Sequence, residues 1–523
     1  MFRCSTASRR LVLLTTAPLP RAASAAATPR KPSLGGRSQQ QLYSTSVGGG
    51  GGEDGPGFTR RTRLIGLAVA GGALIWYASR RRRVALAERH RERARRDNEL
   101  PEISSGVADV DGPLGSPVRV VDWSEIASMI RKQATSFRFE GHNGAPGRID
   151  TVRFESNSPT EDNWAVGVGA GVGGAKSIYA GVYDGHAGWA CSEVLRQKLI
   201  PYVSAMLAPL APDAAGDAVD AAIMKAFCRL DDQIMTAGRE SVTDSTDPVA
   251  AESMSALAPA IAGSCALLTV YDTQTSTLRT AVTGDSRAVL GTRSSSSSSP
   301  GSAYAAVALS VDQTGFNEDE VRRLDAAHPG EKDAILDPKT GRLMGLAVTR
   351  AFGDHRWKYP RELVARVERR FAGYAPRKPA LTPPYLTARP EVTTRRVAAD
   401  DFVIMASDGL WDVISNDDAV ACVSQWLAER KRGGSPSSPR HRHRDAKANW
   451  IYDDDGWPSY KSTPEYFTLE DTDNAAVCLL RNALGGTRGS IVQGLATAAP
   501  PLSRSVRDDI TIQVIFFKDP YHQ

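Results

Sequence analysis

Four turns that carry an aspartate each adjoin a run of residues with strand-like alternation, and this pattern constrains the fold more than any other feature of the chain. The first turn follows the apolar run 179–183 and contains Asp184, Gly185 and His186. A single Asp-Gly turn is common and by itself indicates no site. Three more such turns adjoin alternating segments, and they contain Asp285, Asp408 and Asp508. We therefore expect the ends of several strands to bring carboxylates to one site.

A fifth acidic segment, 157–164, adds Glu161 and Asp162 to this set. The resulting ligand set is rich in oxygen and contains neither a Cys nor a His ligand pair, so it favours Mg²⁺ or Mn²⁺ over zinc. The six cysteines are scattered without a paired spacing, which supports neither a disulfide scaffold nor a zinc site. We expect Cys191 and Cys265 to be buried because they lie in apolar runs.

Taken together and in this order, the five motifs resemble the metal-dependent serine/threonine protein phosphatases of type 2C, over about residues 117–517. The resemblance implies an α+β fold in which two central antiparallel β-sheets are sandwiched between α-helical layers, with a metal centre at one edge. The residues themselves predict an antiparallel meander with strands over 266–271, 277–282 and 287–291. They also predict helices over 188–200 and 317–327, and polar surface loops over 238–256 and 294–302.

The resemblance also implies how the motifs would hold two Mg²⁺ or Mn²⁺ ions and a third, weaker ion. Asp184 would bridge the two ions, and Asp162 would orient metal-bound water. The remaining ligands would be Asp408 and Asp508 for one ion, Glu161 and the Gly185 carbonyl for the other, and Asp285 with Asp408 for the third.

The activity that the resemblance implies is hydrolysis of phosphoserine and phosphothreonine by metal-bound hydroxide, without a covalent phosphoenzyme. His186 would protonate the departing serine or threonine oxygen as general acid, and a pKa of about 6.5 suits a histidine to this task. A purely structural hydrogen bond within the turn is the alternative for His186. A non-catalytic scaffold is a further alternative, but it would lack metal ligands, and none of Glu161, Asp184, Asp408 and Asp508 is missing.

Asn157 departs from the wider family, many members of which carry a phosphate-binding arginine four residues before the position of Glu161. As a substrate-binding residue, Asn157 offers a neutral hydrogen bond in place of a bidentate guanidinium. The segment 156–162 and the pair Asp508-Asp509 resemble the mitochondrial pyruvate dehydrogenase phosphatase branch, whereas Arg389 stands where that branch tends to carry an acidic residue. The implied partner is a phosphorylated protein, either the pyruvate dehydrogenase complex or another mitochondrial phosphoprotein.

The first 50 residues have the composition of a mitochondrial transit peptide, which is disordered in water, because they are rich in Arg, Ser and Ala and contain no acidic residue. Residues 1–100 carry 19 Lys/Arg against 6 Asp/Glu, whereas the rest of the chain carries 45 against 53. The body of the protein is therefore acidic, and this argues against nucleic acid as a partner.

Residues 64–78 are apolar and uncharged, and arginines flank them on both sides. They predict a short transmembrane helix, although a length of ~22 Å falls short of a hydrocarbon layer of ~30 Å unless the arginines snorkel. A buried helix of the folded domain is the alternative. A charged linker over 80–115 would then connect the anchor to a catalytic domain over 116–523, at the inner mitochondrial membrane. The sequence leaves open whether this domain faces the matrix or the intermembrane space.

Overall fold

A computed structural model describes residues 121–521, apart from 245, 246, 248, 294–302, 372, 433–450, 453–457 and 472. The chain divides into two units, and residues 9–114, which form the second, lie outside this description. The predicted transit peptide, apolar segment and linker, at 1–50, 64–78 and 80–115, therefore lie outside the described residues, as does the loop 294–302. Within the described part of the chain, no helix is both long enough and apolar enough to cross a bilayer.

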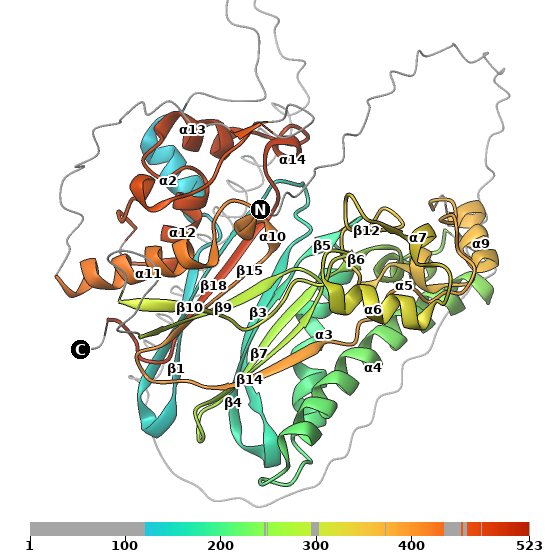
Figure 1. The fold of residues 1–523 in the computed structure, drawn as a ribbon, viewed down its shortest axis with the longest axis horizontal. Helices are drawn as coiled ribbons and strands as arrows, with labels where there is room; N and C mark the ends of the chain where they lie inside the picture. Colours follow the sequence, from blue (N-terminus) through green and yellow to red (C-terminus); the bar gives the residue numbers. More distant parts are fainter. Residues whose placement is uncertain are drawn as a thin grey trace, which may run out of the picture. The chain divides into compact units, whose positions relative to one another are not determined.

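Two antiparallel β-sheets form the centre of the fold (Figure 1). The six-stranded sheet has the order β1 (Thr135–Glu140), β2 (Pro146–Phe154), β18 (Ile510–Phe516), β15 (Phe402–Ala406), β9 (Arg287–Arg293) and β10 (Tyr304–Ala308). The five-stranded sheet has the order β14 (Glu391–Arg396), β8 (Thr277–Thr283), β7 (Ala266–Asp272), β4 (Lys176–Tyr183) and β3 (Asn163–Ala170).

Alternation along the strands places apolar side chains on both faces of each sheet. In β4, Ile178, Ala180 and Val182 pack in the cluster shared with the six-stranded sheet. Tyr179 and Tyr183 of the same strand point the other way, into the cluster formed with helices. Each sheet is thus buried on both faces.

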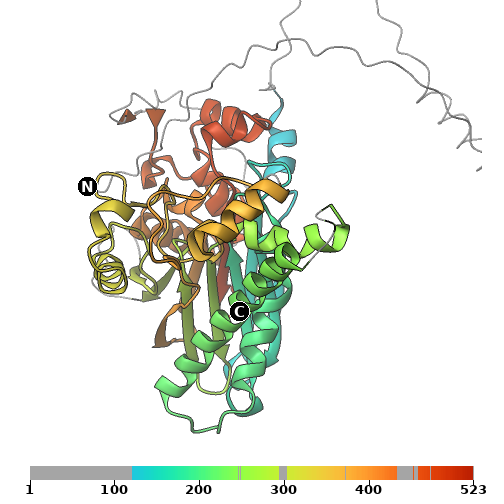
Figure 2. The same ribbon diagram turned by 90° about the vertical axis from the view of Figure 1, so that its right-hand side faces the viewer.

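Helices cover the outer face of each sheet (Figures 1 and 2). Those packed on the five-stranded sheet are α3 (Ala190–Leu207), α4 (Gly216–Thr243) and α5 (Ala251–Ile261), with α9 (Arg361–Phe371) behind α4 and α5. Those on the six-stranded sheet are α2 (Trp123–Arg131), α10 (Asp408–Trp411), α11 (Asn416–Lys431), α12 (Ala475–Ala483) and α13 (Gly489–Thr497). This arrangement confirms the expected α+β fold.

Shorter elements complete the fold around one end of the sheets. A three-stranded sheet has the order β13 (Phe352–Gly353), β6 (Gly263–Ser264) and β5 (Gly185–His186). The other short strands are β11 (Leu336–Asp337), β12 (Arg342–Leu343), β16 (Ile451–Tyr452) and β17 (Pro458–Ser459). The remaining helices are α6 (Glu318–Ala327), α7 (Lys332–Ile335), α8 (His355–Lys358) and α14 (Ser503–Val506), with the 3₁₀ turns η2 (His142–Gly144), η3 (Val172–Gly174) and η4 (Pro464–Tyr466).

Three local predictions need correction. The expected meander breaks after β8, because Gly284 takes a φ of +105° and β9 joins the other sheet. The stretch 238–256 is largely helical, since α4 continues to Thr243 and α5 begins at Ala251. Helix α3 also extends beyond its predicted end, through Pro201. Sequence periodicity indicates the type of an element but not its pairing partner, so a strand can alternate correctly and still belong to another sheet.

Candidate metal centre

Three of the predicted ligands meet where the strands end. Asp184 follows β4, Asp285 lies between β8 and β9, and Asp408 begins α10 directly after β15. One carboxylate oxygen from each lies within 4.8 Å of the others. The register explains this convergence, because Ala406 of β15 pairs with Arg287 of β9.

The three carboxylates fit a hard divalent cation. Burial raises the pKa of Asp184, Asp285 and Asp408, and the negative charges of neighbouring aspartates raise it further. For Asp285 the pKa reaches about 6. The Oδ2 atom of Asp184 is buried and has no hydrogen-bond partner among the described residues. An unpartnered buried oxygen amid repelling carboxylates is costly, and Mg²⁺ or Mn²⁺ would remove that cost.

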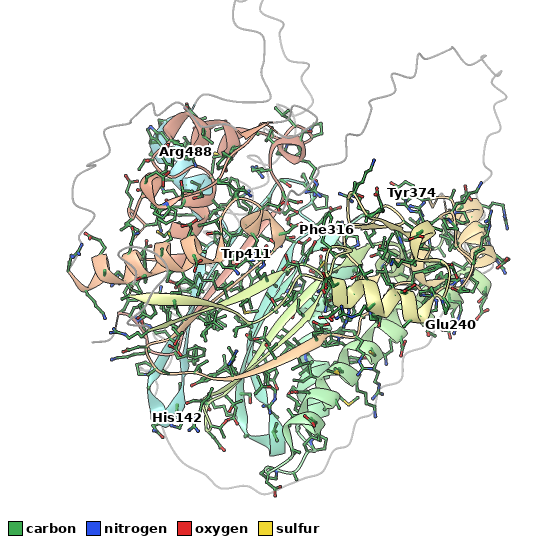
Figure 3. All side chains as sticks on the ribbon, viewed as in Figure 1. His142, Glu240, Phe316, Tyr374, Trp411 and Arg488 are labelled. Atoms are coloured by element: carbon green, nitrogen blue, oxygen red, sulfur yellow. The ribbon has the colours of Figure 1, made fainter. Side chains whose placement is uncertain are left out.

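Helix α10 holds Asp408 against the end of β15. The Ser407 backbone N–H donates to the carbonyl oxygen of Thr511 on β18 at 3.1 Å. At the other end of the short helix, the Trp411 Nε1–H donates to the Ala406 carbonyl oxygen at 3.0 Å (Trp411 is labelled in Figure 3). Asp408 thus projects from a turn that is fixed on both sides.

Asp508 lies outside this three-carboxylate cluster, although its charge raises the pKa of both Asp184 and Asp408. Its Oδ1 atom accepts a hydrogen bond of 2.7 Å from the Asp509 backbone N–H. The same oxygen forms an ion pair with Arg504, one helical turn earlier in α14. A guanidinium therefore lies beside a carboxylate that the resemblance assigns to a metal.

Glu161 and Asn157 interact with each other across one turn of the loop before β3. The Asn157 Nδ2 atom donates to Glu161 Oε2 at 3.1 Å, and the Gly188 backbone N–H donates to Oε1 at 2.7 Å. Burial raises the pKa of the Glu161 carboxyl. A Cβ atom at Gly185 would lie 2.2 Å from the Glu161 carbonyl oxygen, so the close approach of the two segments requires glycine there.

Asp162 lies behind the cluster, fully inside the protein. It accepts a hydrogen bond of 2.8 Å from the Ser407 Oγ–H at the start of α10. Burial, together with the nearby charge of Asp509, raises the pKa of Asp162 to about 8. This residue thus links the Glu161 loop to the turn that carries Asp408.

Asp509, which the sequence analysis noted only as part of a pair resembling one branch of the family, organises the loop 156–162. Its Oδ1 atom accepts from the backbone N–H groups of Ser156 (2.5 Å) and Asn157 (3.1 Å), and its Oδ2 atom accepts from Glu161 (2.8 Å) and Asp162 (3.4 Å). The hydroxyls of Ser156 and Thr160 donate to it as well. Burial would raise the pKa of Asp509, but these hydrogen bonds outweigh burial and hold the pKa below its ordinary value.

His186 has a partner that sequence reasoning missed. Its Nε2 atom lies 2.6 Å from Oδ2 of Asp354, a buried residue in the left-handed region at φ 58°. Burial would lower the pKa of His186, but the charge and hydrogen bond of Asp354, together with the charges of Asp285 and Glu161, outweigh burial and raise it. The signal available in the sequence was a Gly353-Asp354 turn after an apolar run, a pattern too common to single out.

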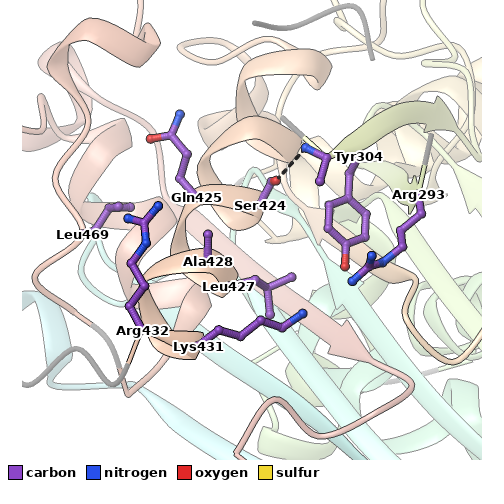
Figure 4. A pocket seen from close by; sticks show the side chains of 10 residues that line it. Arg293, Tyr304, Ser424, Gln425, Leu427, Ala428, Lys431, Arg432 and Leu469 are labelled. Carbon is purple, nitrogen blue, oxygen red and sulfur yellow. Dashed lines mark hydrogen bonds between the residues drawn. The ribbon is translucent and has the colours of Figure 1, made fainter. Parts of the chain in front are cut away.

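A cavity of about 280 Å³ lies elsewhere, between β10 and α11 (Figure 4). Basic side chains of Arg293, Lys431 and Arg432 line it together with Tyr304 and Leu427. It contains none of the predicted site residues. The candidate metal centre is instead a cluster of side chains at a sheet edge.

Comparisons with known proteins identify related sequences. The family model described as "Protein phosphatase 2C" matches residues 165–445, a range that contains Asp184, Asp285 and Asp408. A protein phosphatase 2C homologue of Schizosaccharomyces pombe is 37% identical over 381 residues, which cover 71% of this chain and 80% of the relative.

One further sequence relative and one solved structure are also similar to this chain, to different degrees. The mitochondrial "[Pyruvate dehydrogenase [acetyl-transferring]]-phosphatase 1" of Saccharomyces cerevisiae is 34% identical over 411 residues, which cover 71% of this chain and 69% of the relative. Among solved structures, that of a sex-determining protein of C. elegans covers 74% of this chain and 65% of its own, at 15% identity and a TM-score of 0.39. The structural similarity is too low to support any argument.

Proposed function

The chain belongs to the protein phosphatase 2C family and is a serine/threonine protein phosphatase, and we propose that it dephosphorylates the pyruvate dehydrogenase complex in mitochondria. The family is metal-dependent, and the observation that carries the chemistry is the meeting of Asp184, Asp285 and Asp408 within 4.8 Å. When bound, Mg²⁺ or Mn²⁺ would neutralise the charge of the phosphate and supply hydroxide near neutral pH.

In this proposal each carboxylate has a distinct task. Asp184 would contribute to holding two ions, with Asp408 and Asp508 as further ligands of one and Glu161 and the Gly185 carbonyl as ligands of the other. Asp162 would orient water, and Asp285 with Asp408 would hold a third, weaker ion. The unpartnered Oδ2 atom of Asp184 supports its role as a ligand. The hydrogen bonds that fix Glu161 support a ligand held in one orientation before the ion arrives.

The chain's own proton donor in this proposal is His186. The Asp354 carboxylate, 2.6 Å from Nε2, stabilises the imidazolium form and sets the orientation of the ring. The proton would pass from His186 to the departing serine or threonine oxygen, which would otherwise leave as a strongly basic alkoxide. Asp354 is accordingly a positioning residue, since its contact is with His186 and not with substrate.

The substrate and the compartment are inferred from relatives and from sequence. The yeast relative is named for its action on pyruvate dehydrogenase, and the segment 156–162 and the pair Asp508-Asp509 support the same branch. We assign residues 1–50 to a transit peptide, 64–78 to a short membrane anchor, 80–115 to a linker and 116–523 to the catalytic domain.

The test is release of phosphate from phosphorylated pyruvate dehydrogenase and from a generic phosphoserine peptide by the full-length protein. Each substrate is assayed with Mg²⁺, with Mn²⁺ and with chelator, alongside Asp184→Asn. We expect metal-dependent release from both substrates and its loss in the variant. Release from the peptide alone would keep the chemistry and reject the substrate. A folded protein inactive on both would favour the scaffold alternative.

A second candidate substrate class is a set of phosphoproteins in the intermembrane space. The apolar segment 64–78, which follows a basic leader, supports this alternative, because such a segment can stop transfer across the inner membrane. Protease treatment of mitoplasts separates the two. Degradation of the catalytic domain would place it in the intermembrane space, away from the pyruvate dehydrogenase complex of the matrix.

A further inference from the structure

Metal ions held at this centre would contact a phosphate ester, and an arginine beside them would add directed, charge-assisted hydrogen bonds. Among the described residues near the cluster, the basic side chains of Arg287 and Arg507 already form hydrogen bonds with other groups. Arg287 makes two hydrogen bonds to Asp312, of 2.9 and 2.5 Å. The guanidinium of Arg507 donates to backbone carbonyls, including that of Leu495 at 2.8 Å, and lies over the ring of Phe154.

Asn157 is committed as well, because its Nδ2 atom donates to Glu161. A neutral amide already shared with a carboxylate provides little compensation for the charge of a phosphate dianion. Asn157, the position expected to bind substrate, therefore supports Glu161. An arginine that contacts the phosphate would have to lie on another element.

We propose that Arg504 of α14 binds the substrate phosphate, an inference that rests on the proposed phosphatase function. Its Nη1 atom pairs with Asp508, whereas Nε and Nη2 make no hydrogen bond within the described part of the chain. The side chain is 44% exposed, so substrate can reach it from solvent.

The ion pair with Asp508 places this guanidinium beside a predicted metal ligand. Burial lowers the pKa of Arg504, but the hydrogen bond to Asp508 and the charges of Asp508, Asp408 and Glu161 outweigh burial and raise it. The charge of Arg504 is thus stabilised by carboxylates from three segments of the site. The pairing with Asp508 at i,i+4 holds one edge of the guanidinium and leaves its other donors for a tetrahedral anion.

The test compares Arg504→Gln and Arg504→Lys with Arg196→Gln in the full-length protein. Arg196 is a matched control, because it lies on helix α3, pairs with Glu193 in the same helix and is also 44% exposed. Hydrolysis of p-nitrophenyl phosphate at saturating Mn²⁺ gives KM, kcat and the inhibition constant of inorganic phosphate. Calorimetry measures the binding of inorganic phosphate directly, and a separate Mn²⁺ titration gives the metal midpoint.

For Arg504→Gln we expect KM and the inhibition constant of phosphate to rise by about 10- to 100-fold, with a smaller change in kcat. Arg504→Lys should recover part of the loss, since it keeps the charge but not the fork of donors. Arg196→Gln should match the wild type. If Arg504→Gln does not fold, KM and phosphate binding are compared between Arg504→Lys and the wild type.

The inference is overturned if phosphate binds Arg504→Gln within twofold of wild type. It is also overturned if the defect disappears as Mn²⁺ is raised, because Arg504 would then act only through the metal sites. The assay does not depend on pyruvate dehydrogenase, so rejection of that substrate leaves it unaffected. A wild-type protein that binds phosphate but hydrolyses no ester would reject the proposed function and still test Arg504 by calorimetry.

Discussion

Replacement of Asp509 by asparagine should loosen the loop that carries Glu161 and weaken metal binding. Each oxygen of Asp509 accepts two backbone N–H bonds, with lengths of 2.5 and 3.1 Å at Oδ1 and of 2.8 and 3.4 Å at Oδ2. An asparagine side chain in either orientation presents its NH₂ group to one of these pairs. Two N–H groups then lose a charged acceptor and face another donor. The expected loss in the free energy of unfolding is about 2–5 kcal/mol.

A loss of this size leaves the protein folded, since typical stabilities are about 5–15 kcal/mol. The loop 156–162 would still form but would hold Glu161 less firmly, and loss of such an outer contact lowers metal affinity by about 10- to 100-fold. Urea unfolding of the full-length protein measures the first effect, and the Mn²⁺ midpoint for hydrolysis of p-nitrophenyl phosphate measures the second. Asp400→Asn is the control, because the Asp400 side chain is 50% exposed and pairs with Arg293, which is itself half exposed.

The reasoning would be refuted by an Asp509→Asn protein whose unfolding free energy lies within about 0.5 kcal/mol of wild type, the range expected for a surface substitution. If the protein loses stability but its Mn²⁺ midpoint is unchanged, only the predicted effect on metal binding is refuted. In that case Asp509 would stabilise the fold without positioning Glu161.

Three other perturbations test different parts of the site and fold. Asp354→Asn should reduce kcat on a phosphoserine peptide by about 10²-fold or more. The loss of kcat on p-nitrophenyl phosphate should be much smaller, because the leaving group of that substrate needs no proton from His186. Equal losses on both substrates would contradict the role assigned to Asp354. Gly185→Ala should abolish activity and lower the melting temperature, because the added Cβ would lie 2.2 Å from the Glu161 carbonyl oxygen. A variant with wild-type activity and melting temperature would show that this close approach does not require glycine. Burial would raise the pKa of Glu320, but hydrogen bonds from two arginines outweigh burial and lower the pKa from 4.5 to about 2. The ionised form of Glu320 therefore stabilises the fold by about 3 kcal/mol above pH 4.5. This contribution disappears as the pH falls towards 2. The difference in unfolding free energy between wild type and Glu320→Gln should therefore shrink over that range, and a constant difference would contradict the linkage.

The sequence predicted the elements that carry the site more successfully than their partners in space. Asp184, Asp285 and Asp408 could be found because each follows an alternating run and ends it with a polar turn, which is a local signal. The pairing of Asp354 with His186 could not be found in this way, since it joins residues 168 positions apart. The contacts of Asp509 with the loop before β3 span about 350 positions, which exceeds any local pattern.

Local rules also failed where a single residue redirected the chain. The alternation of 277–283 and 287–293 is correct for both strands, but the turn at Gly284 sends them into different sheets. Similarly, the polar composition of 238–256 resembles that of a loop, whereas packing against α5 and α9 keeps the end of α4 helical. Tertiary contacts override composition in such segments.

The position of β18 has a consequence for the order in which the enzyme becomes functional. This strand, near the C-terminal end of the chain, lies between β2 and β15 in the middle of its sheet. Until the ribosome has released it, β2 and β15 have no strand between them, and Asp508 and Asp509 are absent from the site. Until β18 is made, the nascent chain therefore exposes two sheet edges, a state prone to aggregation that favours capture by chaperones. Completion of the sheet and of the proposed metal site thus depend on the same late segment of the chain.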